Sequence, residues 1–233
     1  FYKLSWPIIQ SFKKDFLFTK DNYAIFNDGT IPFSHIINAY LNPFSNIETN
    51  FQLSTTIISF FIFLVFSLIL KKVFSKINYI DILLTSSVFL LLPFFRASAF
   101  WGKNENYGWL FFMLALYFFL EIKKNLEKET SKKDIINVIF FCFTSACALY
   151  ARQAFLFLPI SYLLYLFLYK ANKKVISISI ISFLILAIPG ILLILVWGGL
   201  YDTKNLDPGT FYGSWLHPKY ILMNVPIFLS FVG

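Results

Sequence analysis

The chain has 233 residues, of which 58% are hydrophobic, 21% aromatic and 14% charged, and its net charge is +8. Soluble domains carry a charge on about a quarter of their residues, so this composition excludes an ordinary water-soluble protein. The lysines lie beside apolar segments, as membrane anchors do, and are not interleaved with aromatic residues as in nucleic-acid binders. We therefore expect an all-α integral membrane protein with no nucleic-acid partner.

Residues 1–50 are too polar to cross a bilayer, and we expect them to form an external loop. Within this region, Phe33–Leu41 is amphipathic and ends before Pro43, which predicts one short interfacial helix at the membrane surface. The Asp28-Gly29 step before it is a turn signal. Asp28 is therefore either part of a turn or a carboxylate beside a site at the membrane surface.

The rest of the chain alternates apolar runs with short polar linkers. A bilayer core of about 30 Å needs about 20 apolar residues in a helix. The runs that come close to this length are Leu53–Leu70, Ile82–Phe95, Tyr107–Ile122, Ile135–Tyr150, Phe155–Tyr169 and Val175–Trp197. A further run begins near Tyr220 and is cut by the end of the chain. Residues 51–233 thus predict about seven membrane helices, and residues 1–233 a single polytopic bundle that is a fragment of a longer protein.

Lysines mark every second linker of this pattern. The linkers at 71–81, 121–134 and 170–174 carry 3, 5 and 3 lysines, whereas the intervening linkers together carry only 5 basic residues. Cytoplasmic loops of membrane proteins are enriched in Lys and Arg, so the lysine-rich linkers are predicted to be cytoplasmic. The other linkers then share the external face with residues 1–50. That face is the periplasm in a bacterium and the lumen of the endoplasmic reticulum in a eukaryote.

The linker at 96–106 is the first of three polar clusters on the predicted external face. It brings Arg96, Lys103, Glu105 and Asn106 into a short stretch. One interpretation makes its cations anchors for lipid headgroups, with the neighbouring aromatic residues at headgroup depth. The other makes these side chains binding residues, because an external linker has no need of basic residues for its topology.

Arg152-Gln153 forms the second cluster, at a short turn between two apolar runs. An arginine at such a place is costly unless its side chain reaches outward to water or pairs with an anion. Its planar fork of N–H donors suits a phosphate group. Both the outward-reaching and the phosphate-binding interpretations stay open.

The third cluster is the long loop at 198–219, which contains Asp202, Lys204 and His217. Loops of this length are usually functional or disordered, and the aromatic residues of this loop argue against disorder. Two interpretations stay open: these aromatic residues form a platform for sugar rings, or they lie in the membrane interface.

Metal and nucleotide chemistry find no support in the sequence. Cys142 and Cys147 lie in one apolar run, on different faces of a helix, so they are not expected to pair. The chain has only two histidines and no spacing of metal ligands, so we expect no metal site. It also lacks the glycine-rich motifs that cradle nucleotides. An activated donor substrate would therefore be carried by a lipid.

Short stretches of these clusters match the motifs of a known family in the same order. They are Gly29-Thr30-Ile31-Pro32-Phe33, Glu105-Asn106-Tyr107-Gly108, Arg152-Gln153, Gly198-Gly199, Asp202-Thr203-Lys204 and Leu216-His217-Pro218. On these residues the chain resembles the polyprenyl-phosphate-sugar-dependent glycosyltransferases of the GT-C superfamily, and among them the dolichyl-phosphate-glucose α-1,2-glucosyltransferases. That family has Thr-Asn after its Arg-Gln, where this chain has Ala154-Phe155, which favours a bacterial relative with another sugar.

The resemblance implies transfer of a sugar from a polyprenyl phosphate, which is the donor substrate, to a hydroxyl of a glycan or lipid-linked acceptor. It needs no further cofactor and places the site on the periplasmic face of the inner membrane, in contact with membrane lipid. The implied substrate-binding residues are Arg152, Gln153, Arg96, Glu105, Asn106, Asp202, Lys204 and His217. The acidic general base is expected upstream of Phe1, with Asp28 as the alternative. The competing interpretation is a multi-spanning transporter or flippase of lipid-linked or small polar substrates.

Overall fold

The computed structural model describes residues 2–26, 31–92, 96, 104–125 and 131–197. Within these residues every regular element is a helix and none is a strand. The elements are α1 (Tyr2–Lys14), α2 (Phe16–Asp21), the 3₁₀-helix η1 (Tyr23–Phe26), α3 (Phe33–Tyr40), α4 (Glu48–Val73), α5 (Tyr79–Leu91), α7 (Asn104–Asn125), α8 (Lys132–Ala151), the 3₁₀-helix η2 (Gln153–Leu156), α9 (Phe157–Leu168) and α10 (Lys173–Trp197). The prediction of an all-α chain is confirmed for the described residues.

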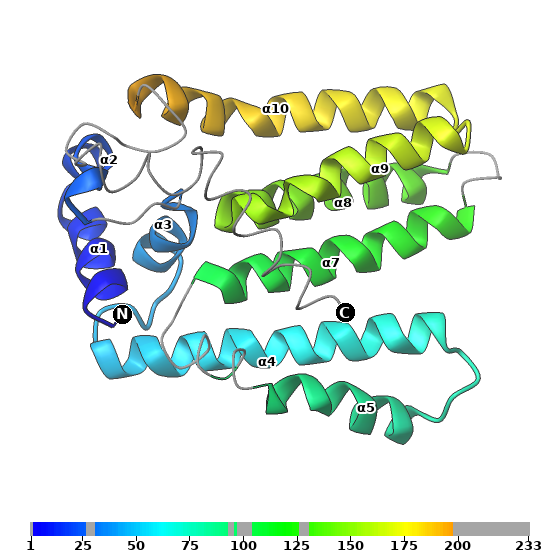
Figure 1. Ribbon diagram of the computed structural model, residues 1–233, viewed down its shortest axis with the longest axis horizontal. Helices are drawn as coiled ribbons and strands as arrows, with labels where there is room; N and C mark the ends of the chain where they lie inside the picture. Colours follow the sequence, from blue (N-terminus) through cyan, green and yellow to red (C-terminus); the bar gives the residue numbers. More distant parts are fainter. Residues whose placement is uncertain (1, 27–30, 93–95, 97–103, 126–130, 198–233) are drawn as a thin grey trace, which may run out of the picture.

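The long helices lie side by side, and the short helices α1, α2 and α3 gather at one end of them (Figure 1). Neighbouring contacts join α5 to α4, α4 to α7, α7 to α8, and α8 to α10. Among the described residues, three helices are long and apolar enough to cross a membrane, namely α4, α8 and α10. The shorter apolar helices are α5, which ends at Leu91 before the predicted Phe95, and α9, which ends at Leu168, one residue before its predicted end.

The alternating chain direction gives the array of long helices two different ends. One end holds α1–α3, the starts of α4 and α7, and the last turns of α8 and α10 (Figure 1); we call it the α1–α3 end. The opposite end, here the lysine end, carries the basic last turns of α4 and α7. The first residues of α8 and α10 are lysines as well. The lysine-rich linkers of the sequence therefore meet at one end of the array.

Three apolar clusters hold the helices together. The largest joins α7, α8, α9 and α10 through buried residues such as Phe141, Tyr162 and Leu166. A second one joins α4 to α7 around Ile62 and Met113. Close van der Waals packing in these clusters fixes which helix faces meet.

The third cluster builds the α1–α3 end, and it explains helices that the sequence pattern did not predict. Ile8, Ile9 and Phe12 of α1 are fully buried against Tyr23 and Phe51. This packing stabilises α1 although Pro7 lies inside it. The described residues before α4 thus hold α1, α2, η1 and α3, rather than a loop with one helix at 33–41. The predicted helix itself is present as α3.

Hydrogen bonds tie α1 to the turn that leads into α4. The ammonium group of Lys13 donates to the carbonyl oxygen of Ser45 at 2.7 Å and to Oδ1 of Asn46 at 2.8 Å. Desolvation by burial lowers the pKa of Lys13 from its ordinary value. The small helices are thereby fastened to the start of α4, beside the polar cluster described next.

Candidate functional site

The turn between α8 and η2 positions Arg152. Helix α8 ends at Ala151, and Arg152 caps it with an extended backbone (φ −152°, ψ 120°) whose amide donates to the carbonyl oxygen of Ala148 at 2.9 Å. The chain then turns into η2, which begins at Gln153. The short turn predicted between two apolar runs is confirmed, and it presents Arg152 at the α1–α3 end.

Arg152 forms an ion pair with Glu105 of α7. The Glu105 side chain is 15% exposed and the Arg152 side chain 38%, so the pair is half-buried and is shielded from water more than a surface pair is. Glu105 lies in the first turn of α7, where the helix dipole favours a carboxylate. The sequence marked both residues as binding residues, and the structure pairs them with each other.

A glycine lets α7 and the Arg152 turn approach closely. A Cβ atom on Gly108 would lie 2.7 Å from Cε2 of Phe155 and 3.6 Å from Cγ of Arg152. Real Cβ contacts are not that short, so a side chain at position 108 would displace the Phe155 ring. Gly108 therefore sets the distance across which Glu105 reaches Arg152.

Asn106 follows Glu105 in the sequence, and Gln153 follows Arg152. Each has one buried side-chain atom that makes no hydrogen bond among the described residues. The side chain of Asn106 donates to the hydroxyl of Ser59 on α4, and the residue is 2% exposed. Within the described residues, Oδ1 of Asn106 and Nε2 of Gln153 are buried and meet no hydrogen-bond partner. Other atoms of this kind, such as Asn137 Nδ2 and Ser145 Oγ, lie within α8 rather than at its end. Because buried polar atoms normally have partners, these two amide groups can serve a bound polar group.

A network of hydrogen bonds between amide and hydroxyl side chains joins the helices at the α1–α3 end. The hydroxyl of Tyr107 donates to Oδ1 of Asn38 at 2.6 Å, and Nδ2 of Asn42 donates to the same oxygen at 3.0 Å. Nδ2 of Asn42 also donates to Ser54 of α4 at 2.8 Å. This network joins α3, α4 and α7, and sequence reasoning missed it. Asn38 lies in α3 and Asn42 just beyond its end, and no pattern of the sequence linked either residue to Tyr107.

The remaining predicted site residues are not brought into this cluster. Arg96 is exposed, and its backbone amide donates to the carbonyl oxygen of Leu92 at 3.0 Å. Asp28, Asp202, Lys204 and His217 lie outside the described residues, as does the predicted helix from Tyr220. The structure thus pairs Glu105 with Arg152, and Asn106 and Gln153 are their neighbours in sequence. The binding roles of all the predicted site residues stay predictions.

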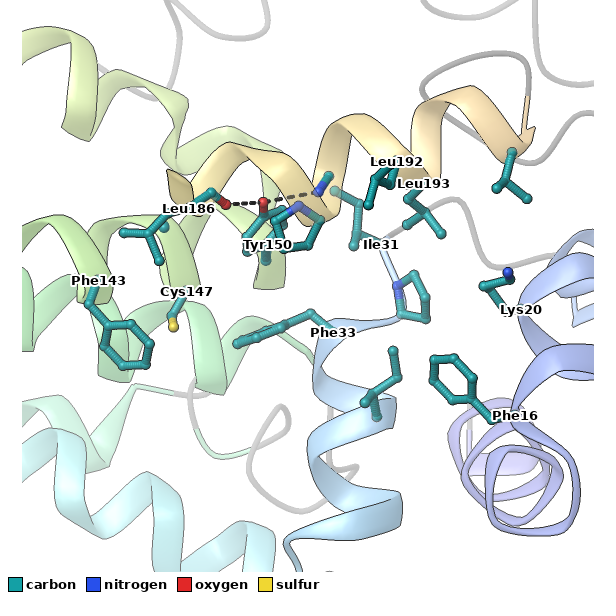
Figure 2. Close-up of a pocket in the computed structure, with 16 residues that line it drawn as sticks. Phe16, Lys20, Ile31, Phe33, Phe143, Cys147, Tyr150, Leu186, Leu192 and Leu193 are labelled. Carbon is teal, nitrogen blue, oxygen red and sulfur yellow. Dashed lines mark hydrogen bonds between the residues drawn. The ribbon is translucent and has the colours of Figure 1, made fainter. Parts of the chain in front are cut away.

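An apolar pocket of about 500 Å³ lies between α3, α8 and α10, near the same end. Its lining includes Phe33 of α3, Cys147 of α8 and Leu186 of α10, and Figure 2 shows Lys20 at one side of it, opposite Phe143 and Cys147. Its volume falls within the range of about 300–1,000 Å³ that is usual for small-molecule pockets. None of the four clustered site residues lines it.

Tyr150 forms part of the pocket wall by joining α8 to α10. Its hydroxyl donates to the carbonyl oxygen of Leu186 and accepts from the amide of Gly190 at 3.1 Å (Figure 2). These are the two groups that a regular α-helix would bond to each other. A Cβ atom on Gly190 would lie 2.9 Å from Cε1 of Tyr150, so the absence of a side chain there admits the tyrosine ring.

Metal ligands do not cluster in the described part of the chain, where no group of three His, Cys, Asp or Glu residues could hold an ion. Cys142 and Cys147 are both free and buried, as the sequence predicted.

No protein-family model, curated protein or solved structure matches the chain. The assignment to the GT-C superfamily therefore stays a prediction from sequence motifs.

Proposed function

We propose that the chain is an integral membrane protein whose lysine end faces the cytoplasm. Helices α4, α8 and α10 are long and apolar enough to cross a membrane. Large side chains of α10, such as Leu184 at 65% and Leu195 at 71% exposure, point away from the protein, and water-soluble monomers rarely expose large apolar faces. The collection of lysines at one end agrees with the rule for cytoplasmic loops. The α1–α3 end is then external.

The proposed activity is transfer of a sugar from a polyprenyl phosphate to an acceptor hydroxyl at that external end. The observation that carries it is the pairing of Arg152 with Glu105, whose sequence neighbours Gln153 and Asn106 each keep a buried amide atom without a hydrogen-bond partner among the described residues. A sugar linked to a phosphate needs a cation for the phosphate and hydrogen-bonding groups for its hydroxyls. The cluster offers both at the place where a lipid-borne phosphate would lie.

In the proposed reaction, the acceptor oxygen forms a bond to the anomeric carbon while the bond from that carbon to the phosphate oxygen breaks. A carboxylate takes the acceptor's proton, and the phosphate leaves with an additional negative charge. A fixed cation lowers the barrier because the charge on the phosphate oxygen grows in the transition state. A guanidinium carries five N–H donors, so Arg152 keeps donors for a phosphate while Glu105 holds its fork in place.

Replacement of Arg152 tests this proposal. The protein is reconstituted in vesicles, and transfer of radiolabelled sugar is measured with polyprenyl-phosphate glucose and polyprenyl-phosphate mannose as donors. Arg152→Ala should lower the rate by about 100-fold or more, as expected for loss of a group that stabilises transition-state charge. Arg152→Lys, which keeps the charge and loses the planar fork, should retain part of the rate.

Lys72→Ala provides the matched control, because Lys72 forms an ion pair with Glu121 at the opposite end of the array. Its transfer rate should stay close to that of the unchanged protein. Full activity in a folded Arg152→Ala protein would contradict the proposed role of Arg152. Movement of the lipid-linked sugar across the vesicle membrane without transfer would favour a transporter.

A further inference from the structure

The pocket between α3, α8 and α10 has the composition of a site for a hydrocarbon chain. Its walls are formed by apolar and aromatic side chains, among them Phe33, Phe143 and Leu193. The hydroxyl of Tyr150, which borders it, is already bonded to α10 at Leu186 and Gly190. A ligand in the body of the pocket would therefore gain mainly from burial of apolar surface.

One side of the pocket is different, because Lys20 from α2 lies there (Figure 2). Lys20 pairs with Asp21 at 3.2 Å, and their side chains are 26% and 50% exposed, so water reaches the pair. Such exposed pairs contribute little, so an anionic group can compete for the lysine. The occupant that matches this arrangement has a long apolar part and a negative charge at one end.

Helix α2 places Lys20 at the level of lipid headgroups if the long helices cross the bilayer. It lies at the α1–α3 end, and it exposes Leu17 at 63% and Phe18 at 56%. Helices with exposed apolar side chains and nearby lysines are typical of the membrane interface. Residues 1–26 contain four lysines and two aspartates, so this part of the chain carries a net positive charge that favours an anionic ligand.

The pocket is separate from the proposed transfer site. Neither Arg152 nor Glu105 lines it, and the charged group that does is Lys20. A phosphate bound at Lys20 is therefore not the phosphate that Arg152 would serve. We infer that this pocket holds one acyl chain of an anionic phospholipid, with the lipid phosphate against Lys20. The lipid is a bound component of the fold, and its binding goes beyond sugar transfer and does not require it.

Photo-crosslinking in vesicles tests the inference. The protein is reconstituted in phosphatidylcholine with a trace of phosphatidylglycerol that carries a diazirine on one acyl chain, and labelled peptides are mapped by mass spectrometry after illumination. Label should concentrate on the pocket-lining residues of α8 and α10. Unlabelled phosphatidylglycerol should compete for this labelling better than unlabelled phosphatidylcholine does.

Two pairs of variants separate the pocket from the general lipid-facing surface. Leu192 lines the pocket and Leu195 does not, and both are exposed on α10, at 57% and 71%. Leu192→Trp should reduce pocket labelling several-fold, whereas Leu195→Trp should leave it unchanged. Lys20→Gln should weaken the preference for phosphatidylglycerol by about fivefold, the effect of one surface charge on an anionic lipid, and Lys14→Gln should not.

Three outcomes would overturn the inference. They are equal labelling of the two tryptophan variants, equal competition by the two phospholipids, and stronger competition by polyprenyl phosphate than by phosphatidylglycerol. None of these measurements involves sugar transfer. A failure here therefore leaves the proposed activity untouched, and a failure of the transfer assay leaves this site untouched.

Discussion

The two ends of the helix array each use one ion pair to join neighbouring helices, but they use it differently. At the lysine end, Lys72 of α4 pairs with Glu121 of α7 and also lies over the ring of Tyr117, 3.6 Å from its centroid. At the α1–α3 end, Arg152 pairs with Glu105 at a sharp turn. The ammonium group of Lys72 is thus covered by an anion and an aromatic face, whereas the fork of Arg152 has further donors.

The polar groups around each pair strengthen this difference. At the lysine end, Lys71 donates to the carbonyl oxygens of Ser75 and Ile77 and closes the connection from α4 to α5. At the other end, Asn106 and Gln153 keep buried atoms with no partner among the described residues. Polar groups that bond to one another complete a fold, while polar groups left open beside a cation are suited to a ligand. The comparison therefore separates a structural end from a candidate functional end.

The largest expected effect on stability comes from Gly108, on which the approach of α7 to the Arg152 turn depends. Gly108→Val should lower the free energy of unfolding by about 1–3 kcal/mol, because the new side chain overlaps the Phe155 ring. Thermal unfolding in detergent, followed by circular dichroism, measures the change. The free energy of unfolding of Gly108→Ser should lie between those of the unchanged protein and of Gly108→Val. An unchanged midpoint for Gly108→Val would mean that the close contact between Gly108 and Phe155 is absent.

A smaller loss of stability is expected when the hydroxyl of Tyr107 is removed. Tyr117, which lies on the same helix toward the lysine end, provides the comparison. Tyr107→Phe removes the hydroxyl that donates to Asn38, and should cost about 1 kcal/mol, since Asn42 still donates to the same oxygen. Tyr117→Phe keeps the ring that Lys72 contacts, so its unfolding free energy should be unchanged within error. Chemical denaturation of both variants in detergent gives the comparison. Equal losses would show that the hydroxyl network does not distinguish the two ends.

The smallest effect concerns the cap of α8 at the lysine end. The hydroxyl of Ser131 accepts from the amide of Asp134 at 3.2 Å, and the Asp134 carboxylate accepts from the amide of Ser131 at 2.9 Å. Ser131→Ala should cost about 0.5–1 kcal/mol, and Ser131→Asn, which can still cap, should cost less. Sugar transfer should be unaffected by either change. Loss of transfer in Ser131→Ala would contradict the assignment of this end as structural.

The sequence predicted the long helices well because their signal is local. Apolar runs between polar linkers indicated α4, α7, α8 and α10 within a few residues of their observed ends. Helix α7 begins at Asn104 rather than Tyr107, because Glu105 is favourable in a first helical turn. Helix α1 was missed because Ile8 and Phe12 are stabilised by packing against distant residues, which composition does not reveal.

The candidate site was predicted in its members and not in its geometry. Arg152, Gln153, Glu105 and Asn106 were all marked by their polar character beside apolar runs. The pairing of Arg152 with Glu105 joins residues 47 positions apart, and it depends on how α7 packs on α8. Nothing local to either residue encodes that contact. The same holds for Tyr107 and Asn38, which are 69 positions apart.

The insertion of Tyr150 into α10 has a mechanical consequence. Its hydroxyl lies between the carbonyl of Leu186 and the amide of Gly190, and Pro189 has no amide to donate to Ile185. The α10 backbone ladder therefore lacks one hydrogen bond at Pro189, and the Tyr150 hydroxyl bonds to both end groups of the next one. A tyrosine from α8 thus braces α10 at the level where its proline weakens it.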